Sequence, residues 1–145
     1  MDVSATVKSS RNGHEACVGT AGNSQSIAVP GKPAGQGSAV NGGELMLLAL
    51  ATCYCNDLYR EAARLGIAVD GVEVTAKATF PGIGLAATDI RYEVGISSSA
   101  PPAAIADLVR QTDAVAEVHN TIRTGVPVLL DHHRIRSAPA TRINQ

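Results

Sequence analysis

The 145-residue sequence has very few aromatic residues: it lacks tryptophan and contains one phenylalanine and three tyrosines, together 3% of the chain. Proteins that bind single-stranded nucleic acids without sequence preference stack the bases on aromatic side chains, so this composition argues against that class. Hydrophobic residues make up 45% of the chain and charged residues 17%, which excludes global disorder. A core must therefore be built from Ala, Val, Ile and Leu.

The sequence also has no excess of charge of either sign. Twelve basic and thirteen acidic residues give a formal charge of −1, and no block of like charges occurs. Binding to a phosphate backbone or an anionic membrane surface needs a basic patch, so neither nucleic acid nor membrane is expected as a partner. The longest apolar run, residues 45–51, is too short to span a bilayer. Residues 1–4 do not resemble the start of a secretory signal.

Three cysteines, an odd number, do not suggest a disulfide framework, and a reducing, cytoplasmic location fits better. The His, Cys, Asp and Glu residues show no zinc-site spacing, and the Gly-rich segment at 35–37 lacks the Lys-Ser/Thr of a phosphate loop. We therefore expect no metal and no cofactor. The length suits one domain spanning residues 1–145.

The N-terminal part predicts a three-stranded meander. Residues 2–9 and 14–20 alternate in polarity around Asn12-Gly13, which is a strong hairpin signal. A third strand is expected over 25–29, followed by a long Gly- and Pro-rich loop over 30–43.

A long helix is predicted next, over residues 44–65. Asn41 can cap it, Glu44 can close the capping box, and Gly66 ends it. Its second half is amphipathic, and the sequence predicts that Leu58, Tyr59, Ala62 and Leu65 share the buried face while Asn56, Asp57, Arg60, Glu61 and Arg64 face outward. Its first half is apolar on every side, so it must be covered on more than one side. A second subunit is the simplest candidate for the additional cover.

The C-terminal part predicts a hairpin of two strands, 67–80 and 86–98. A helix over 102–117, a further helical turn over 118–123 and a last strand over 126–130 follow. Together these elements predict an α+β fold with antiparallel sheets and a long central helix.

Two cysteines share the central helix. Cys53 and Cys55 are two positions apart, so their side chains point to nearly opposite faces and cannot form a disulfide with each other. Cys55 lies on the stripe predicted to be buried and is interpreted as a core residue, as is Cys17 on its strand. Cys53 lies in line with Ala49, Leu50, Asp57 and Arg60, where the apolar half meets the polar half. Composition alone allows either a structural cysteine or a nucleophile at this position, since a nucleophile needs a cation or hydrogen-bond donors nearby.

The stretch Asn41-Gly42-Gly43-Glu44-Leu45, the following Ala- and Leu-rich run, Cys53 and the ending Ala62-Ala63-Arg64-Leu65-Gly66 resemble the signature of the OsmC/Ohr family. The segment over 118–128 is similar to the family's late segment before its last strand. This resemblance implies an intertwined homodimer with two active sites at its interface.

The resemblance also implies a thiol-dependent peroxidase acting on organic hydroperoxides or hydrogen peroxide. Cys53 would attack the O–O bond and become a sulfenic acid. An arginine from the first hairpin lowers the energy of the thiolate in the family. Arg11 is the matching residue, although it could equally be an exposed turn arginine.

The sequence departs from the family at two positions. Gly43 replaces the glutamate that orients the arginine, and Glu44, one residue later, is interpreted mainly as a capping residue and less readily as a substitute. Ala116 replaces the resolving cysteine, so an external thiol would have to reduce Cys53. His119, three residues later, could accept a proton or orient a ligand in the pocket, or could be a partly exposed residue at a helix end.

Two hypotheses follow. The first is a peroxidase that uses Cys53 and Arg11 and is resolved by an external thiol. The second is a catalytically incomplete protein of the same fold that binds a small apolar ligand, or senses redox state, at the dimer interface. Gly43 and Ala116 favour the second hypothesis, whereas Cys53 and Arg11 favour the first.

Overall fold

The computed structural model describes residues 1–136, and it begins with a three-stranded antiparallel sheet. The strands β1 (Val3–Ser10), β2 (Gly13–Thr20) and β3 (Asn23–Ile27) lie in the order β1-β2-β3. Ser10 pairs with Gly13, so Arg11 and Asn12 form the turn at the end of the first hairpin. The predicted meander is confirmed, with the third strand two residues earlier than expected.

The central helix α1 (Gly42–Leu65) has the predicted caps at both ends, and it starts two residues before the predicted range of 44–65. The backbone N–H of Glu44 donates to Asn41 Oδ1 over 2.9 Å, and the backbone N–H of Asn41 donates to Glu44 Oε2 over 2.7 Å. Gly66 ends the helix in the left-handed conformation, with φ of 67°. Glu44 therefore acts as the capping residue that the sequence predicts.

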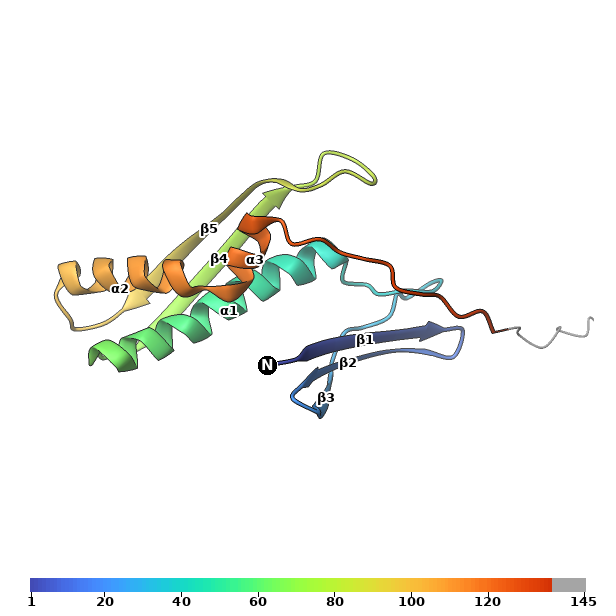
Figure 1. Cartoon of the computed structure of the whole chain (residues 1–145), viewed down its shortest axis with the longest axis horizontal. Coiled ribbons are helices and arrows are strands. Elements are labelled where there is room, and N and C mark those ends of the chain that lie inside the picture. Colours follow the sequence, from blue (N-terminus) through green and yellow to red (C-terminus); the bar gives the residue numbers. More distant parts are fainter. Residues whose placement is uncertain (137–145) are drawn as a thin grey trace, which may run out of the picture.

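The remaining elements form a second layer against α1. Strands β4 (Gly71–Thr79) and β5 (Thr88–Ser97) pair as an antiparallel hairpin, and α2 (Pro102–Val115) and α3 (Glu117–Thr124) follow. Helix α1 contacts both β4 and α2. The three-stranded sheet lies on the other side of α1 from the β4–β5 hairpin (Figure 1). The arrangement is the predicted α+β fold.

The core lies where α1 meets α2 and the β4–β5 hairpin. Its buried members are Tyr54, Leu58, Ala62, Leu108 and Ala116. Half-buried aliphatic side chains of β4 and β5 pack against this cluster. By contrast, Ala16 is the only buried residue of β1, β2 and β3. Most of the buried core of the described residues therefore lies between α1 and this second layer.

The predicted orientation of the second half of α1 is confirmed for Leu58 and Ala62, which are buried, but it was wrong at three positions. Tyr59, predicted to be buried, is 43% exposed, whereas Asp57 and Glu61, predicted to be exposed, are only 4% and 7% exposed. Helix α2 and the β4–β5 hairpin contact α1 from two directions. The buried face of α1 is therefore wider than the stripe of apolar residues predicted from the sequence, and it is rotated relative to that stripe. The buried carboxylates pair with Arg60 and Arg64, each over 2.6 Å, which offsets their desolvation.

The predicted strand over 126–130 is also wrong for this chain. Those residues are extended but form no β-pairing within residues 1–136. Val128, Leu129 and Leu130 are 98%, 82% and 87% exposed. A strand needs the free edge of a neighbouring strand, and this segment pairs with no strand among residues 1–136.

None of the helices within residues 1–136 combines the length and the apolar character needed to span a bilayer.

Removal of a central core side chain should destabilise the second layer strongly. Leu58 is fully buried, so Leu58→Ala should lower the free energy of unfolding by about 3 kcal/mol. Urea unfolding followed by circular dichroism measures this difference. The matched control is Leu85→Ala at the tip of the β4–β5 hairpin, where the side chain is 59% exposed and the change should stay within about 0.5 kcal/mol. Equal losses in the two variants would contradict the assigned core.

Candidate functional site

Cys53 lies on the wall of an apolar cleft of about 720 Å³ between the three-stranded sheet and the first half of α1. The cleft is lined mainly by aliphatic side chains, from β1 (Val7), β2 (Val18), β3 (Ile27) and α1 (Leu45 and Leu48). Cys17 lines the same cleft, and all three cysteines of the chain are free thiols. The half-buried Cys53 thus lies at the boundary between this apolar cleft and a group of polar side chains on α1 and α3.

That polar cluster consists of Cys53, Asp57, Arg60 and Glu117. The Cys53 thiol donates to Asp57 Oδ2 over 3.3 Å, and its sulfur lies 3.9 Å from Glu117 Oε2. Arg60 Nη1 lies 2.6 Å from Asp57 Oδ1 and 3.7 Å from Glu117 Oε1. One guanidinium therefore holds two carboxylates that both approach the same sulfur.

The spacing along α1 explains how this cluster forms. Residues four apart on a helix lie on the same face, as Cys53 and Asp57 do, and residues three apart also meet, as Asp57 and Arg60 do. Helix α3 supplies the rest, because its N-cap residue Ala116 is fully buried and the first helical residue, Glu117, lies beside Cys53. Glu117 therefore follows directly the residue that the sequence comparison aligned with the family's second cysteine.

The surroundings of Cys53 favour its protonated form. Burial raises the pKa of the Cys53 thiol, and the hydrogen bond and charge of Asp57 and the charge of Glu117 raise it further. The backbone N–H of Val118 acts in the opposite direction as a donor to the sulfur. Burial also raises the pKa of Asp57, although Cys53 and Arg60 oppose that shift. The thiol and the carboxyl group are thus two proton sites in direct contact.

Three potential metal ligands meet in this cluster. One ligand atom each from Cys53, Asp57 and Glu117 lies within 4.8 Å of the other two. However, Arg60 already pairs with both carboxylates and neutralises part of their charge. The cluster is therefore better described as an ion-pair network around a thiol than as an open cation site.

The structure separates Arg11 and Glu44 from this cluster. Arg11 is exposed at the β1–β2 turn, and within residues 1–136 it forms no hydrogen bond or ion pair. Glu44 is engaged in the cap of α1. At Gly43, a Cβ atom would lie 2.9 Å from the ring of Phe80. The region near the family's missing carboxylate is therefore occupied by an aromatic ring, and one chain does not bring Arg11 to Cys53.

His119 is buried, not exposed at a helix end. It is 4% exposed, and its ring lies 4.7 Å from that of Tyr92 and 5.7 Å from that of Tyr54, centroid to centroid. Neither ring nitrogen has a hydrogen-bond partner among the described residues. Burial lowers the pKa of His119, and the nearby Arg123 lowers it further. His119 therefore packs against Tyr54 and Tyr92 and does not line the cleft at Cys53.

The sequence pattern contains information about Asp57 and Arg60 as site residues, but their polarity alone predicts that they face outward from α1. Both lie in line with Cys53, and a carboxylate four residues after a cysteine on a helix is within reach of the thiol. Glu117 had a weaker signal, since it follows the position of the family's resolving cysteine. Its contact depends on how α3 crosses α1, which local spacing does not define.

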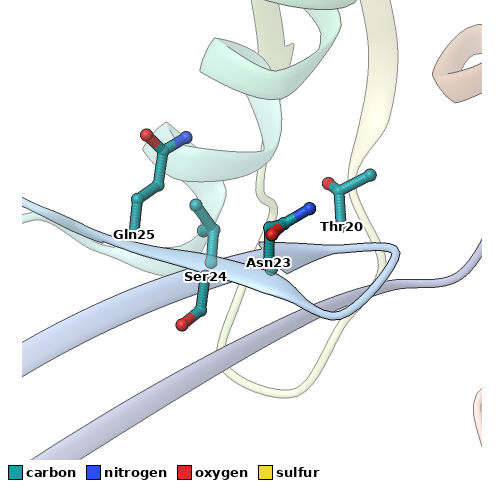
Figure 2. Close-up of a pocket in the computed structure, with 6 residues that line it drawn as sticks. Thr20, Asn23, Ser24 and Gln25 are labelled. Carbon is teal, nitrogen blue, oxygen red and sulfur yellow. The ribbon is translucent and has the colours of Figure 1, made fainter.

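Another hollow, of about 250 Å³, lies at the end of the β2–β3 hairpin (Figure 2). It is lined by Thr20, Asn23, Ser24 and Gln25 among others, and no lining side chain is ionisable. It offers no charge and no ionisable group that could activate the hydroxyls of Thr20 and Ser24, and so is a weaker candidate site than the cleft at Cys53.

The α+β fold is shared with several solved structures. The OsmC-like protein of Mycoplasma pneumoniae is 15% identical, with a TM-score of 0.60 over 84% of this chain and 86% of that chain. A Legionella pneumophila protein described as an organic hydroperoxide resistance protein, OsmC, is 17% identical, with a TM-score of 0.57 over 85% and 90% of the two chains. An OsmC-like protein of unknown function from Vibrio cholerae is 16% identical, with a TM-score of 0.55 over 83% and 93%.

These structural likenesses define the fold class, and the sequence places the chain within it. The family described as OsmC-like protein matches residues 35–131, which include α1, the β4–β5 hairpin, α2 and α3. The chain therefore belongs to the OsmC-like protein family. No curated protein matches it in sequence.

The buried His119 should make stability depend on pH. Its folded-state pKa is lowered below the ordinary value of 6.5, so the unfolded chain binds the proton more readily. The free energy of unfolding should consequently fall as pH drops from 6.5 toward the lowered folded-state pKa. His119→Phe, which keeps an aromatic ring, should reduce this slope in urea unfolding between about pH 7 and pH 5. His132→Phe, at an exposed position, is the matched control and should leave the slope unchanged. An unaltered slope in His119→Phe would contradict the assignment.

Proposed function

We propose that this protein is a thiol-dependent peroxidase that reduces organic hydroperoxides or hydrogen peroxide through Cys53. The observation that supports this most directly is the position of the Cys53 thiol, which borders an apolar cleft on one side and contacts a carboxylate on the other. The cleft suits the hydrocarbon part of an organic hydroperoxide, and the polar cluster suits its oxygen atoms. The description of the Legionella relative as a hydroperoxide resistance protein agrees with this assignment.

We propose further that an external thiol reduces the oxidised Cys53. Ala116 occupies the position of the family's resolving cysteine and is fully buried. Cys55 lies two residues from Cys53 on the same helix and points away from it. Cys17 lines the cleft but belongs to a separate sheet. Three free thiols also agree with a cytoplasmic location, where thiols stay reduced.

The functional unit in this proposal is a homodimer. In one chain, Leu48 on the apolar first half of α1 is 60% exposed, and β1 is exposed along its whole length. The segment over 126–130 presents exposed apolar side chains and pairs with no strand in the part of the chain that the structure describes. A second copy would cover the helix, the sheet and this segment together, and would bring the partner's hairpin, and with it Arg11 of the partner, toward the cleft.

A second function is favoured by the protonated state of Cys53. Because burial and two carboxylates raise the pKa of this thiol, it resembles an ordinary thiol more than an activated one. The same cleft would then bind a small apolar ligand, with Cys53 as a contact or a redox sensor. The rate at which Cys53 reacts with a peroxide separates these two functions.

The peroxidase proposal predicts selective oxidation of Cys53. One equivalent of cumene hydroperoxide, added with a dimedone-type sulfenic acid trap, should label Cys53 in the intact protein, as measured by peptide mass spectrometry. Cys53→Ser should lose the label, whereas Cys55→Ser and Cys17→Ser should retain it. Labelling no faster than that of a small free thiol would support the ligand-binding function instead. A Cys17–Cys53 disulfide after oxidation would contradict resolution by an external thiol.

The dimer proposal predicts that a charge on the exposed face of α1 separates the subunits. Light scattering after gel filtration at micromolar concentration should give a dimer for the wild type and a monomer for Leu48→Asp, because the charge would be buried in the interface. The matched control is Leu85→Asp, since Leu85 is 59% exposed and Leu48 is 60% exposed. A wild-type monomer, or equal behaviour of the two variants, would contradict the proposal.

A further inference from the structure

Cys53 and Asp57 share one hydrogen bond, and this bond defines the path by which the thiol can lose its proton. The thiol is the donor and the Asp57 carboxylate the acceptor, over 3.3 Å. Asp57 is only 4% exposed, so bulk water does not compete freely for this oxygen. A nucleophilic sulfur must lose its proton before or during attack, and the nearest acceptor in the described chain is this carboxylate.

The two oxygens of Asp57 have different partners. Oδ2 accepts from the thiol, whereas Oδ1 lies 2.6 Å from Arg60 Nη1. Arg60 therefore fixes the plane of the carboxylate and leaves the other oxygen aimed at the sulfur. Arg60 also lies 3.7 Å from Glu117, which ties α1 to the start of α3.

The sulfur has a second neighbour that favours negative charge on it. Helix α3 has no side-chain cap at Ala116, and the backbone of Val118 in its first turn lowers the pKa of the Cys53 thiol. An N–H group at a helix N-terminus stabilises negative charge that develops nearby. The thiol thus lies between a proton acceptor on its own helix and the N-terminus of another helix.

On the basis of the proposed peroxidase function, we propose that Asp57 is a catalytic residue that takes the Cys53 proton and returns it to the leaving alkoxide, with Arg60 as its positioning residue. In this step the sulfur forms a bond to the terminal oxygen of ROOH, and the O–O bond breaks with its electron pair on RO. The thiol proton passes to Asp57 Oδ2 and then to RO, which leaves as ROH. Sulfur is oxidised by two electrons to Cys53–SOH, the peroxide is reduced by two, and Asp57 ends ionised as it began.

The pH dependence of Cys53 oxidation tests this assignment, because the alternatives predict different slopes. When the proton stays within the Cys53–Asp57 pair, the rate should be nearly independent of pH from about pH 5.5 to about pH 7.5. In Asp57→Asn the rate should instead rise about tenfold per pH unit, since it then follows the free thiolate. At about pH 6 the variant should be roughly a hundredfold slower than the wild type. Stopped-flow measurement of sulfenic acid formation with cumene hydroperoxide gives these rates.

A purely electrostatic role for Asp57 predicts the opposite sign. Removal of its negative charge would make the thiolate easier to form, so Asp57→Asn would react faster than the wild type at neutral pH. That result, or a wild-type rate that itself rises tenfold per pH unit, would overturn the assignment while leaving the peroxidase function intact. A wild type whose Cys53 is not oxidised at all would overturn both. The matched control is Asp107→Asn on α2, where the carboxylate pairs with Arg110 and not with Cys53.

Variants at Arg60 keep the proposal testable if Asp57→Asn folds poorly. In Arg60→Gln the carboxylate loses its cation, so the acid end of the pH-independent range should move to higher pH, and Arg60→Lys should restore it. A merely structural role for Arg60 would change the overall rate or the stability without moving this limit. An unmoved limit in a folded Arg60→Gln protein would overturn the positioning role.

Discussion

The candidate site depends on one buried carboxylate that is held by an arginine and shared with a thiol. Asp57 lies within the helix–helix and helix–sheet packing of α1, where an unpaired charge would be strongly destabilising. Arg60 provides the compensating charge from the half-exposed rim, and Cys53 provides the hydrogen bond on the cleft side. The ion pair therefore links the stability of the core to the protonation of the thiol, so that the same contacts maintain the fold and define the chemistry at Cys53.

The elements of the fold whose signals are local could be predicted from the sequence. Asn12-Gly13 defined the first hairpin, and Asn41 with Glu44 defined the start of α1 at the observed residues. The long hairpin, the start of α2 after Pro101 and the end of α3 at Gly125 followed from turn and breaker residues, whereas α2 ends at Val115 and α3 begins at Glu117, earlier than the predicted boundary after residue 117. In each case, a few neighbouring residues determine the backbone conformation, so no knowledge of distant contacts was needed.

The predictions that were wrong concern features that depend on contacts between segments distant in the sequence. The face of α1 that is buried depends on α2 and the β4–β5 hairpin, and these select a stripe that includes Asp57 and Glu61. The segment over 126–130 has strand-forming residues, but it pairs with no strand of the described residues. Likewise, the cysteine was predicted as the centre of the site, but the carboxylate of Glu117 reaches it only through the crossing of α3 over α1.

The three-stranded sheet forms one wall of the cleft, and its strands bury only the side chain of Ala16. A small sheet with so little apolar area removed from water gains little from the hydrophobic effect and is marginal by itself. One wall of the cleft is therefore weakly held, whereas the wall that bears the thiol is anchored in the core. Any molecule that docks on this sheet, whether a ligand or another subunit, would complete the folding of the wall as it binds, and the affinity measured for it would include that ordering free energy.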